Sequence, residues 1–197
     1  MPPGAVIIEK DITDQLEISR TPVRDAIRLL ADERLVDIKP QSGTYVALID
    51  RRRLEEGHLI RRALEAEGIR LAVRNIDEAA NERLNDLLAL QTRAAAKGRH
   101  EEFMAYDDAL HQFITDLGGY ERLWRIISRS KAHLDRARHL CSPLPGQEAT
   151  SIAQHRAIVE ALVQGDADRA VEALAFHLED AYKRLSIGLN QNAQMIG

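Results

Sequence analysis

Apolar residues recur every three or four positions along most of the chain from Leu54 onward, which is the spacing of an amphipathic α-helix. The pattern predicts six helices, at about residues 54–74, 77–97, 101–117, 119–140, 147–164 and 167–189. The strongest break between them is "CSPLPGQ" at 141–147, because it holds two prolines and a glycine. Helices of this length predict an all-α six-helix bundle over residues 54–190.

The first fifty residues follow a more varied pattern than the rest of the chain. "EKDITDQL" predicts a short helix, and Pro22 suits the first turn of a second helix that follows it. Apolar and polar residues then alternate and β-branched residues are common, which predicts a hairpin with strands at 35–38 and 44–48. Helix, turn, helix and two-stranded wing is the order of a winged helix-turn-helix domain. We therefore expect a mainly α protein whose first domain, residues 1–50, has this fold.

The predicted second helix has an apolar face and a charged face. Val23, Ala26, Ile27 and Leu30 have the spacing that turns them inward, which leaves the polar residues between them at the surface. Such a helix fits the DNA major groove, where arginine binds guanine or a phosphate. The candidate DNA-binding residues on this helix, the helix before it and the wing are Lys10, Arg20, Thr21, Arg24, Arg28, Gln41 and Gly43. From the charge pattern alone, an ordinary solvated helix face is an equal alternative.

The charge balance limits how the chain can bind nucleic acid. The net charge is −4, and the first 53 residues hold nine basic and nine acidic side chains, so a local patch must make any contact with DNA. No apolar run approaches the ~20 residues of a membrane helix, and the start lacks the features of a signal peptide. The single Cys141 excludes an internal disulfide and favours a reducing compartment. We expect a cytoplasmic protein with no membrane partner.

Three of the predicted helices carry polar residues at inward-facing positions. Asp107 and His111 are four residues apart on the apolar face of one helix, so both can reach the same point. His155 and His177 lie among inward apolar residues of the last two helices. Three imidazoles and one carboxylate suit Zn²⁺, Ni²⁺, Mn²⁺ or Fe²⁺, and a bound ion would satisfy polar groups that are costly to bury. The pattern predicts a divalent transition-metal site; histidines that only fill the core are the alternative.

Arg61 is the main candidate for binding a small molecule beside such a metal. It shares a helix face with Glu65, and its guanidinium could hold a carboxylate through two hydrogen bonds. A purely structural pair between Arg61 and Glu65, four residues apart, is the alternative. Arg129, His133 and Arg136 are further candidates for the wall of the effector cavity.

The first part of the chain resembles the DNA-binding domain of GntR-family bacterial transcription regulators. "SRTPVRDAI" and "RLVDIKPQSGTYV" are the most specific matches. The resemblance implies that Arg20, Thr21 and Arg24 contact operator DNA and that the region of Gly43 enters the minor groove. The family usually has a glycine where Glu17 stands, and it has one more helix before "PPG". A chain that begins after that helix is expected to bind DNA more weakly.

Residues 54–190 resemble the FCD effector-binding domain of the FadR subfamily. "YDDALHQFI", "QHRAIVEALVQGDADRAVEALAFHL" and "IRRALEAEGIRLA" carry the match. The resemblance implies that the metal ligands are Asp107, His111, His155 and His177, and that Arg61 faces the effector cavity. Six predicted helices in place of seven is typical of the shorter, VanR-like branch.

These observations predict a bacterial transcription regulator that binds operator DNA as a homodimer. A small carboxylate bound beside the metal would change the spacing of the two DNA-reading helices, which must match half-sites about 34 Å apart. Two alternatives stay open. The metal and its ligands could form an enzyme site that acts on a small carboxylate, or the ion itself could be the signal.

Overall fold

The computed structural model describes residues 1–141 and 146–197, so most of the predicted break "CSPLPGQ" lies outside the described residues. The chain divides into two compact units. Residues 1–51 and 189–197 form the first, called the winged unit below, and residues 52–188 form the second, called the helical unit. None of the described helices is both long and apolar enough to cross a membrane.

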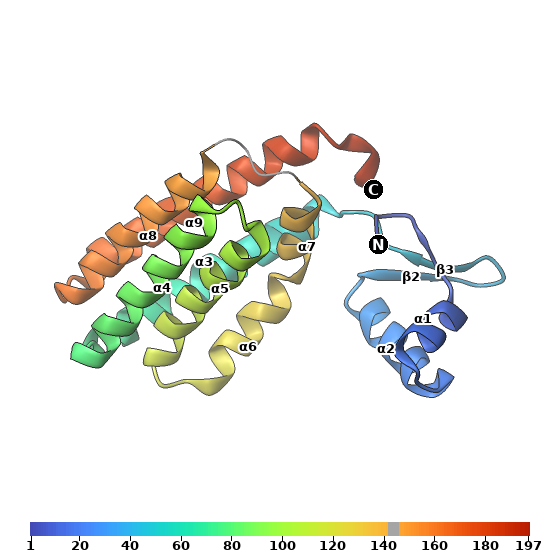
Figure 1. The fold of residues 1–197 in the computed structure, drawn as a ribbon, viewed down its shortest axis with the longest axis horizontal. Helices are drawn as coiled ribbons and strands as arrows, with labels where there is room; N and C mark the ends of the chain where they lie inside the picture. Colours follow the sequence, from blue (N-terminus) through green and yellow to red (C-terminus); the bar gives the residue numbers. More distant parts are fainter. Residues whose placement is uncertain (142–145) are drawn as a thin grey trace. The chain divides into compact units, whose positions relative to one another are not determined.

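The winged unit combines two helices with a small antiparallel sheet (Figure 1). Its elements in chain order are β1 (Val6–Ile7), α1 (Glu9–Leu16), α2 (Arg20–Asp32), β2 (Val36–Lys39) and β3 (Gly43–Val46). The sheet order is β1-β3-β2, so β3 pairs with both other strands. Both predicted strands of the wing form, with bounds that differ by one or two residues. The sequence analysis missed β1, because two residues are too short to show an alternating pattern.

A small apolar cluster holds α1, α2 and the sheet together. Val23 and Ile27 of α2 are buried with Val36 of β2. Ala26 and Leu30, which we expected to face inward, are exposed. They lie outside the contact that α2 makes with α1 and β2, because only the face of Val23 and Ile27 is turned toward those elements.

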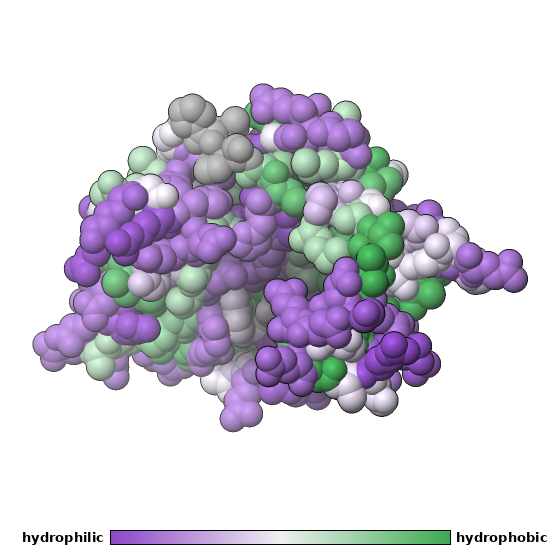
Figure 2. Space-filling view, turned by 45° about the vertical axis from the view of Figure 1, so that its right-hand side comes forward, coloured by the Kyte–Doolittle hydropathy of each residue, from purple (hydrophilic) through white to green (hydrophobic). Residues whose placement is uncertain are grey.

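Large apolar side chains are common on the surface of the winged unit. Hydrophobic areas are visible among the hydrophilic ones on the face of the molecule shown in Figure 2. The exposed large apolar residues of the winged unit are Met1, Val6, Ile8, Leu16, Ile18, Leu29, Leu30, Ile38 and Leu48. Leu30, which we expected to face inward, is one of these exposed residues.

The turn between α1 and α2 requires an unusual backbone conformation. Glu17 ends α1 with φ 53° and ψ 38°, in the left-handed region. Residues with a Cβ are disfavoured there, whereas glycine adopts it freely. The conformation explains physically why a glycine is usual at this position in the family that the sequence resembles.

The last residues of the chain pack on the segment that follows β3. Ile49 and Ile196 form a parallel β-bridge, and the amide of Ile49 donates to the carbonyl of Met195 at 2.8 Å. Ile49 is only 1% exposed. The sequence analysis did not place this C-terminal segment in the winged unit, because a pairing between residues so distant in sequence leaves no local pattern.

The helical unit is built from helices packed side by side, with a main apolar core and a smaller apolar cluster (Figure 1). Its helices in chain order are α3 (Arg51–Ala72), α4 (Glu78–Ala96), α5 (His100–Leu117), α6 (Glu121–Ser130), α7 (Ala132–Leu140), α8 (Gln147–Val163) and α9 (Ala167–Asn190). A short 3-10 turn, η1 (Val73–Asn75), follows α3, and another, η2 (Ala193–Met195), follows α9. The core joins residues of α3, α4, α5, α8 and α9, and these include the helices that carry Arg61 and the four predicted metal ligands.

The predicted helix at 119–140 is two helices in the structure, α6 and α7, separated at Lys131. The break contains no proline or glycine, so the sequence pattern did not reveal it. Lys131 is 1% exposed, and its ammonium donates to Asp108 at 2.7 Å and to Asp135 at 2.6 Å. The described part of this unit thus has seven α-helices, and helix number no longer supports the assignment to a six-helix branch.

Candidate functional site

The structure brings the four predicted metal ligands together in the centre of the helical unit. Asp107 and His111 come from α5, His155 from α8 and His177 from α9. One candidate ligand atom from each residue lies within 4.8 Å of the others. Each of the four residues is at most 2% exposed. Three helices, of which α8 and α9 are consecutive in the chain, thus place one carboxylate and three imidazoles around a single buried point.

Each of the three histidines has an oxygen acceptor at its Nδ1 atom. His111 Nδ1 lies 2.7 Å from Glu65 Oε2, His155 Nδ1 lies 2.7 Å from Gln91 Oε1, and His177 Nδ1 lies 2.9 Å from Gln154 Oε1. These oxygens only accept, so each Nδ1 carries the proton and donates. The sequence analysis did not find Gln91 and Gln154, because nothing in their local pattern marks them as histidine partners.

The two glutamines are themselves held in the orientation that this assignment needs. The Gln91 side-chain amide donates to the carbonyl of Tyr106 at 3.1 Å, and that of Gln154 donates to Asp180 Oδ2 at 2.7 Å. Their Oε1 atoms are therefore left to accept from the histidines. Outer partners of this kind commonly fix the tautomer of metal-binding histidines.

In the neutral imidazole, a proton on Nδ1 leaves the lone pair on Nε2, and the Nε2 atoms of the histidines face the centre of the cluster. His155 Nε2 lies 3.2 Å from His177 Nε2 and 3.5 Å from Asp107 Oδ1. His111 Nε2 is buried and has no hydrogen-bond partner among the described residues. Lone pairs that face one another without a proton between them repel, and a cation would remove that repulsion. Three imidazole nitrogens and one carboxylate oxygen fit a divalent transition metal by number and type.

The charge state of the cluster at neutral pH is the one that a metal needs. Burial alone would raise the pKa of Asp107, but Arg138 and the three histidines outweigh it and hold that pKa well below its usual value. Burial lowers the pKa of His155 to about 3, and it also lowers the pKa of His177 well below its usual value. The carboxylate of Asp107 is thus ionised and the imidazoles of His155 and His177 are neutral, so none of these three groups has to lose a proton before an ion binds.

Asp107 also has a partner outside the cluster. Arg138 of α7 donates from both Nη1 and Nη2 to Asp107 Oδ2, each at 3.2 Å. This leaves Oδ1, the oxygen that faces His155, for the centre of the cluster. All four candidate ligands therefore have an oriented outer partner.

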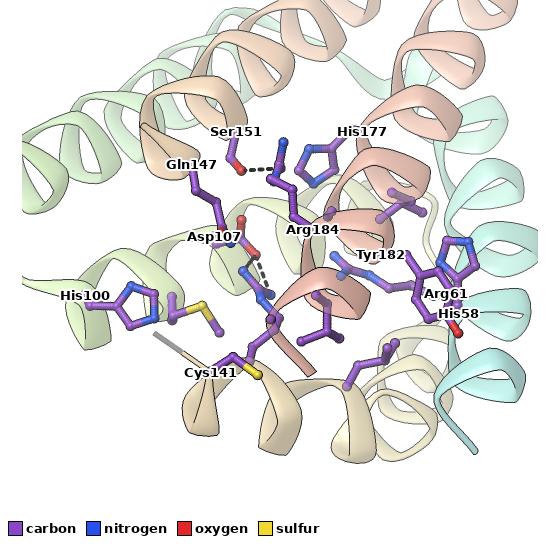
Figure 3. A pocket seen from close by; sticks show the side chains of 17 residues that line it. His58, Arg61, His100, Asp107, Cys141, Gln147, Ser151, His177, Tyr182 and Arg184 are labelled. Carbon is purple, nitrogen blue, oxygen red and sulfur yellow. Dashed lines mark hydrogen bonds and ion pairs between the residues drawn. The ribbon is translucent and has the colours of Figure 1, made fainter. Parts of the chain in front are cut away.

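A cavity opens directly beside the cluster (Figure 3). Asp107 and His177 belong both to its wall and to the cluster. Three arginines from different helices, Arg61, Arg138 and Arg184, also line it. Arginine presents several N–H groups and keeps its charge at any physiological pH, so this wall favours an anionic ligand.

Arg61 makes the expected pair with Glu65 and keeps one donor without an acceptor among the described residues. Its Nε donates to Glu65, and Glu65 Oε2 accepts from His111, so the expected pair with Glu65 exists and extends to a candidate metal ligand. Burial would raise the pKa of Glu65, but Arg61 and His111 outweigh it and lower that pKa to about 2. Arg61 Nη2 is buried and has no acceptor among the described residues. The side chain is therefore anchored by one edge, and a donor remains for a ligand.

The other three expected cavity residues are not part of the wall of this cavity. Arg129 lines a separate hollow at the surface of α5 and α6. His133 is buried on α7, and Arg136 is half-buried there, but neither belongs to the cavity wall. On α7 it is the face of Leu134 and Arg138 that lines the cavity.

The candidate DNA-binding residues all lie at the surface of the winged unit. Lys10, Arg20, Thr21, Arg24, Arg28, Gln41 and Gly43 are all exposed. Arg24 Nε pairs with Glu9 at 2.8 Å, with the two side chains 56% and 32% exposed, and Arg28 lies 3.6 Å from Asp25. Exposed pairs of this kind contribute only about 0–1 kcal/mol, so they leave the arginines available to phosphates or bases.

The tip of the wing is a tight turn between β2 and β3. Gln41 has φ 61° and Gly43 has φ 136°, and the amide of Ser42 donates to the carbonyl of Lys39 at 3.1 Å. The hydroxyl groups of Ser42 and Tyr45 are 2.9 Å apart. The tip therefore presents small and polar groups next to Lys39, as a DNA backbone contact requires.

The chain has a winged helix-turn-helix unit, and a helical unit with a buried cluster of histidines and aspartate follows it. This combination is typical of bacterial transcriptional regulators that bind DNA. The chain matches the family described as "Bacterial regulatory proteins, gntR family" over residues 1–46 and the FCD domain over residues 57–180. It belongs to the GntR family of regulators that carry an FCD domain.

Named relatives agree with this assignment. The HTH-type transcriptional repressor RspR of Escherichia coli (strain K12) is 32% identical over 178 residues, 90% of this chain and 78% of that protein. An uncharacterized HTH-type transcriptional regulator of Streptomyces ambofaciens is 34% identical over 180 residues, 91% of this chain and 75% of that one. The solved structure of E. coli McbR/YncC has a TM-score of 0.83 at 25% identity and covers 94% of this chain and 89% of that one. These proteins are transcriptional regulators and not enzymes, so the enzyme alternative is dropped.

Proposed function

We propose that the protein regulates transcription as a homodimer whose affinity for operator DNA depends on a small carboxylate bound beside a divalent transition metal. The observation that carries the proposal is the convergence of Asp107, His111, His155 and His177, with lone pairs turned inward, beside a cavity with an unpartnered N–H of Arg61. The proposed partners are operator DNA in the cytoplasm, a carboxylate effector and a second copy of the chain.

Asp107 Oδ1 and the Nε2 atoms of the three histidines would hold the ion, which is Zn²⁺, Ni²⁺, Mn²⁺ or Fe²⁺ by ligand type. When bound, the metal supplies a Lewis-acidic position for a carboxylate oxygen. Glu65, Gln91, Gln154 and Arg138 orient the four ligands through their outer contacts. The cavity beside Asp107 and His177 leaves room for the effector to reach this position.

Arg61 would bind the effector carboxylate through its free Nη2 edge. Its Nε remains bonded to Glu65, so the guanidinium is already oriented before a ligand arrives. This pre-orientation lowers the entropy cost of binding. Glu65 links Arg61 to His111, so effector binding and metal binding act on one connected group of side chains.

Two helices of the helical unit connect this site with the winged unit through the chain itself. α3 carries Arg61 and begins at Arg51, the last residue of the first segment of the winged unit. α9 carries His177 and ends at Asn190, within the C-terminal segment that also belongs to the winged unit. A change at the site can therefore alter the spacing of the two α2 helices in a dimer, which must match half-sites about 34 Å apart.

The proposal is tested with the purified chain and with binding sites selected from a random DNA library. Elemental analysis is expected to find a transition metal, and a panel of carboxylates is expected to shift the DNA affinity of the metal-loaded protein. Arg61→Gln should abolish the response to the carboxylate and retain the metal, whereas Arg62→Gln, on the exposed side of the same helix, should behave like the parent. A protein without metal, or one that responds to metal alone and to no carboxylate, would contradict the proposal; the second result would indicate a metal sensor.

A further inference from the structure

The cavity has a second arginine whose position the proposed function does not use. Arg184 comes from α9 and lines the cavity together with Ser151 of α8. Its Nη2 donates to Ser151 Oγ at 3.2 Å, and its Nη1 donates to Asp180. Figure 3 shows Arg184 beside Ser151 and His177, whereas Arg61 lies at another part of the wall, near His58 and Tyr182. The two guanidinium groups therefore mark two separate places in one cavity.

Each of these arginines has a buried N–H group that lacks an acceptor among the described residues. The groups are Arg61 Nη2 and Arg184 Nε. An arginine cannot satisfy such a group by losing a proton, because its pKa lies far above physiological pH. A buried donor on a cationic side chain that lines a cavity favours an acceptor from a bound ligand.

The protein's own carboxylates near these arginines are already engaged. Both oxygens of Glu65 accept, one from Arg61 and the other from His111. Asp180 Oδ2 accepts from both Arg184 and Gln154. No acceptor among the described residues reaches the two remaining N–H groups, so a ligand in the cavity could supply acceptors at two places.

A charge count over the cavity arginines favours the same conclusion. Arg61, Arg138 and Arg184 have the carboxylates of Glu65, Asp107 and Asp180 as partners, so these six groups balance. The divalent ion of the proposed function would leave this set with two positive charges in excess. One acidic group on the ligand would compensate half of that excess, and two would compensate all of it.

We infer that the effector carries two acidic groups, one bound by Arg61 beside the metal position and the other bound by Arg184 and Ser151. The inference rests on the proposed function, since the first of the two places is the carboxylate site assigned there. The hydroxyl group of Ser151 can turn from its contact with Arg184 and donate to the second acid. Arg184 is also joined through Asp180 and Gln154 to the Nδ1 atom of His177, so the second acid would act on a metal ligand as well.

The test compares matched acids on the metal-loaded full chain. Calorimetry would measure the dissociation constants of succinate, glutarate and adipate against butyrate, pentanoate and hexanoate, with metal content verified after each titration. At least one diacid should bind more tightly than its monoacid partner by roughly tenfold to a hundredfold, the effect of a charge-assisted hydrogen bond. Arg184→Gln should remove this advantage and leave the affinity for the monoacid unchanged, and Lys183→Gln, at an exposed neighbouring position, should retain it.

The possible outcomes separate this inference from the proposed function. Monoacids that bind as tightly as diacids, in a manner that depends on Arg61, would overturn the inference and leave the proposed function standing. A diacid advantage that survives Arg184→Gln would also overturn it. If no acid of either series binds, the proposed function and the inference both fail. Should Arg184→Gln not fold, Arg184→Lys keeps the charge but loses Nε, and a reduced diacid advantage is then expected.

Discussion

The two units place their functional side chains in opposite environments. In the winged unit the candidate DNA-binding residues are exposed, and Arg24 pairs with the half-buried Glu9. In the helical unit the four candidate metal ligands are at most 2% exposed, and each has a defined outer partner. Removing an exposed contact changes binding and leaves the fold intact. Removing a buried one changes binding and stability together, because its partners lose their hydrogen bonds as well.

The largest expected effect is the loss of metal from the helical unit. A ligand that binds only the folded state stabilises it by RT ln(1 + [L]/Kd), about 2.7 kcal/mol at a hundredfold excess over Kd. A chelator should therefore lower the melting temperature of the parent protein. His155→Ala removes one ligand and leaves Gln91 Oε1 without its donor. This variant should therefore contain little metal and melt at a lower temperature than the parent. Elemental analysis and melting with and without chelator measure both effects.

His139→Ala is the matched control, since His139 lies exposed on α7 and outside the cluster. It should contain as much metal as the parent and show the same response to chelator. If the parent contains no transition metal and a chelator leaves its melting temperature unchanged, the histidines only fill the core. The helical unit would then have no metal site.

The next effect tests the exposed side of the comparison. Arg24→Ala should weaken binding to selected operator DNA by about 1–3 kcal/mol, the contribution of one bidentate contact to a base. The melting temperature should stay nearly the same, because only the exposed pair with Glu9 is lost. Fluorescence anisotropy and thermal melting measure the two quantities. The control is Arg83→Ala, which changes an exposed arginine of α4 and should alter neither the DNA affinity nor the melting temperature. If Arg24→Ala binds DNA as tightly as the parent, Arg24 of α2 does not contact the operator.

A smaller effect is expected from the outer partner of a metal ligand. Glu65→Gln keeps the shape of the side chain but removes the charge that Arg61 and His111 face. Metal affinity should fall by about 10–100-fold, as is usual when such outer partners are changed. Competition with a chromophoric chelator measures the affinity, and Glu67→Gln, exposed on the same helix, serves as the control. Equal affinities for both variants would show that Glu65 does not orient His111.

The smallest effect concerns the strained turn of the winged unit. Glu17→Gly should stabilise that unit by about 0.5–1 kcal/mol, because relief of the left-handed strain exceeds the entropy cost of glycine. Hydrogen exchange of the amides in α1 and α2 would show slower opening. Asp14→Gly, inside α1, should have the opposite effect, since glycine destabilises a helix interior by about 1 kcal/mol. Faster exchange in Glu17→Gly would mean that Glu17 contributes more than its backbone conformation suggests.

The sequence by itself determined the features that arise within single elements. The helical period places Asp107 and His111 on one face and turns His155 and His177 inward, because the geometry of one helix fixes the direction of each side chain. The hairpin of the wing is equally local, since its alternation and its turn lie within about a dozen residues. For the same reason the polar residues of α2 could be placed at the surface before the structure was known, whereas the inward face proved narrower than expected, because Ala26 and Leu30 are also exposed.

Only the tertiary structure decided which helices meet and at what rotation. The contacts of His155 with Gln91 and of His177 with Gln154 join side chains of different helices, and no local pattern specifies how two helices are turned toward each other. The break at Lys131 lacks any proline or glycine signal, so the placement of Arg138 on the cavity wall, in contact with Asp107, became visible only in the fold. Packing across the bundle, with its choice of partner for each buried polar group, is a property of the whole unit and not of any segment.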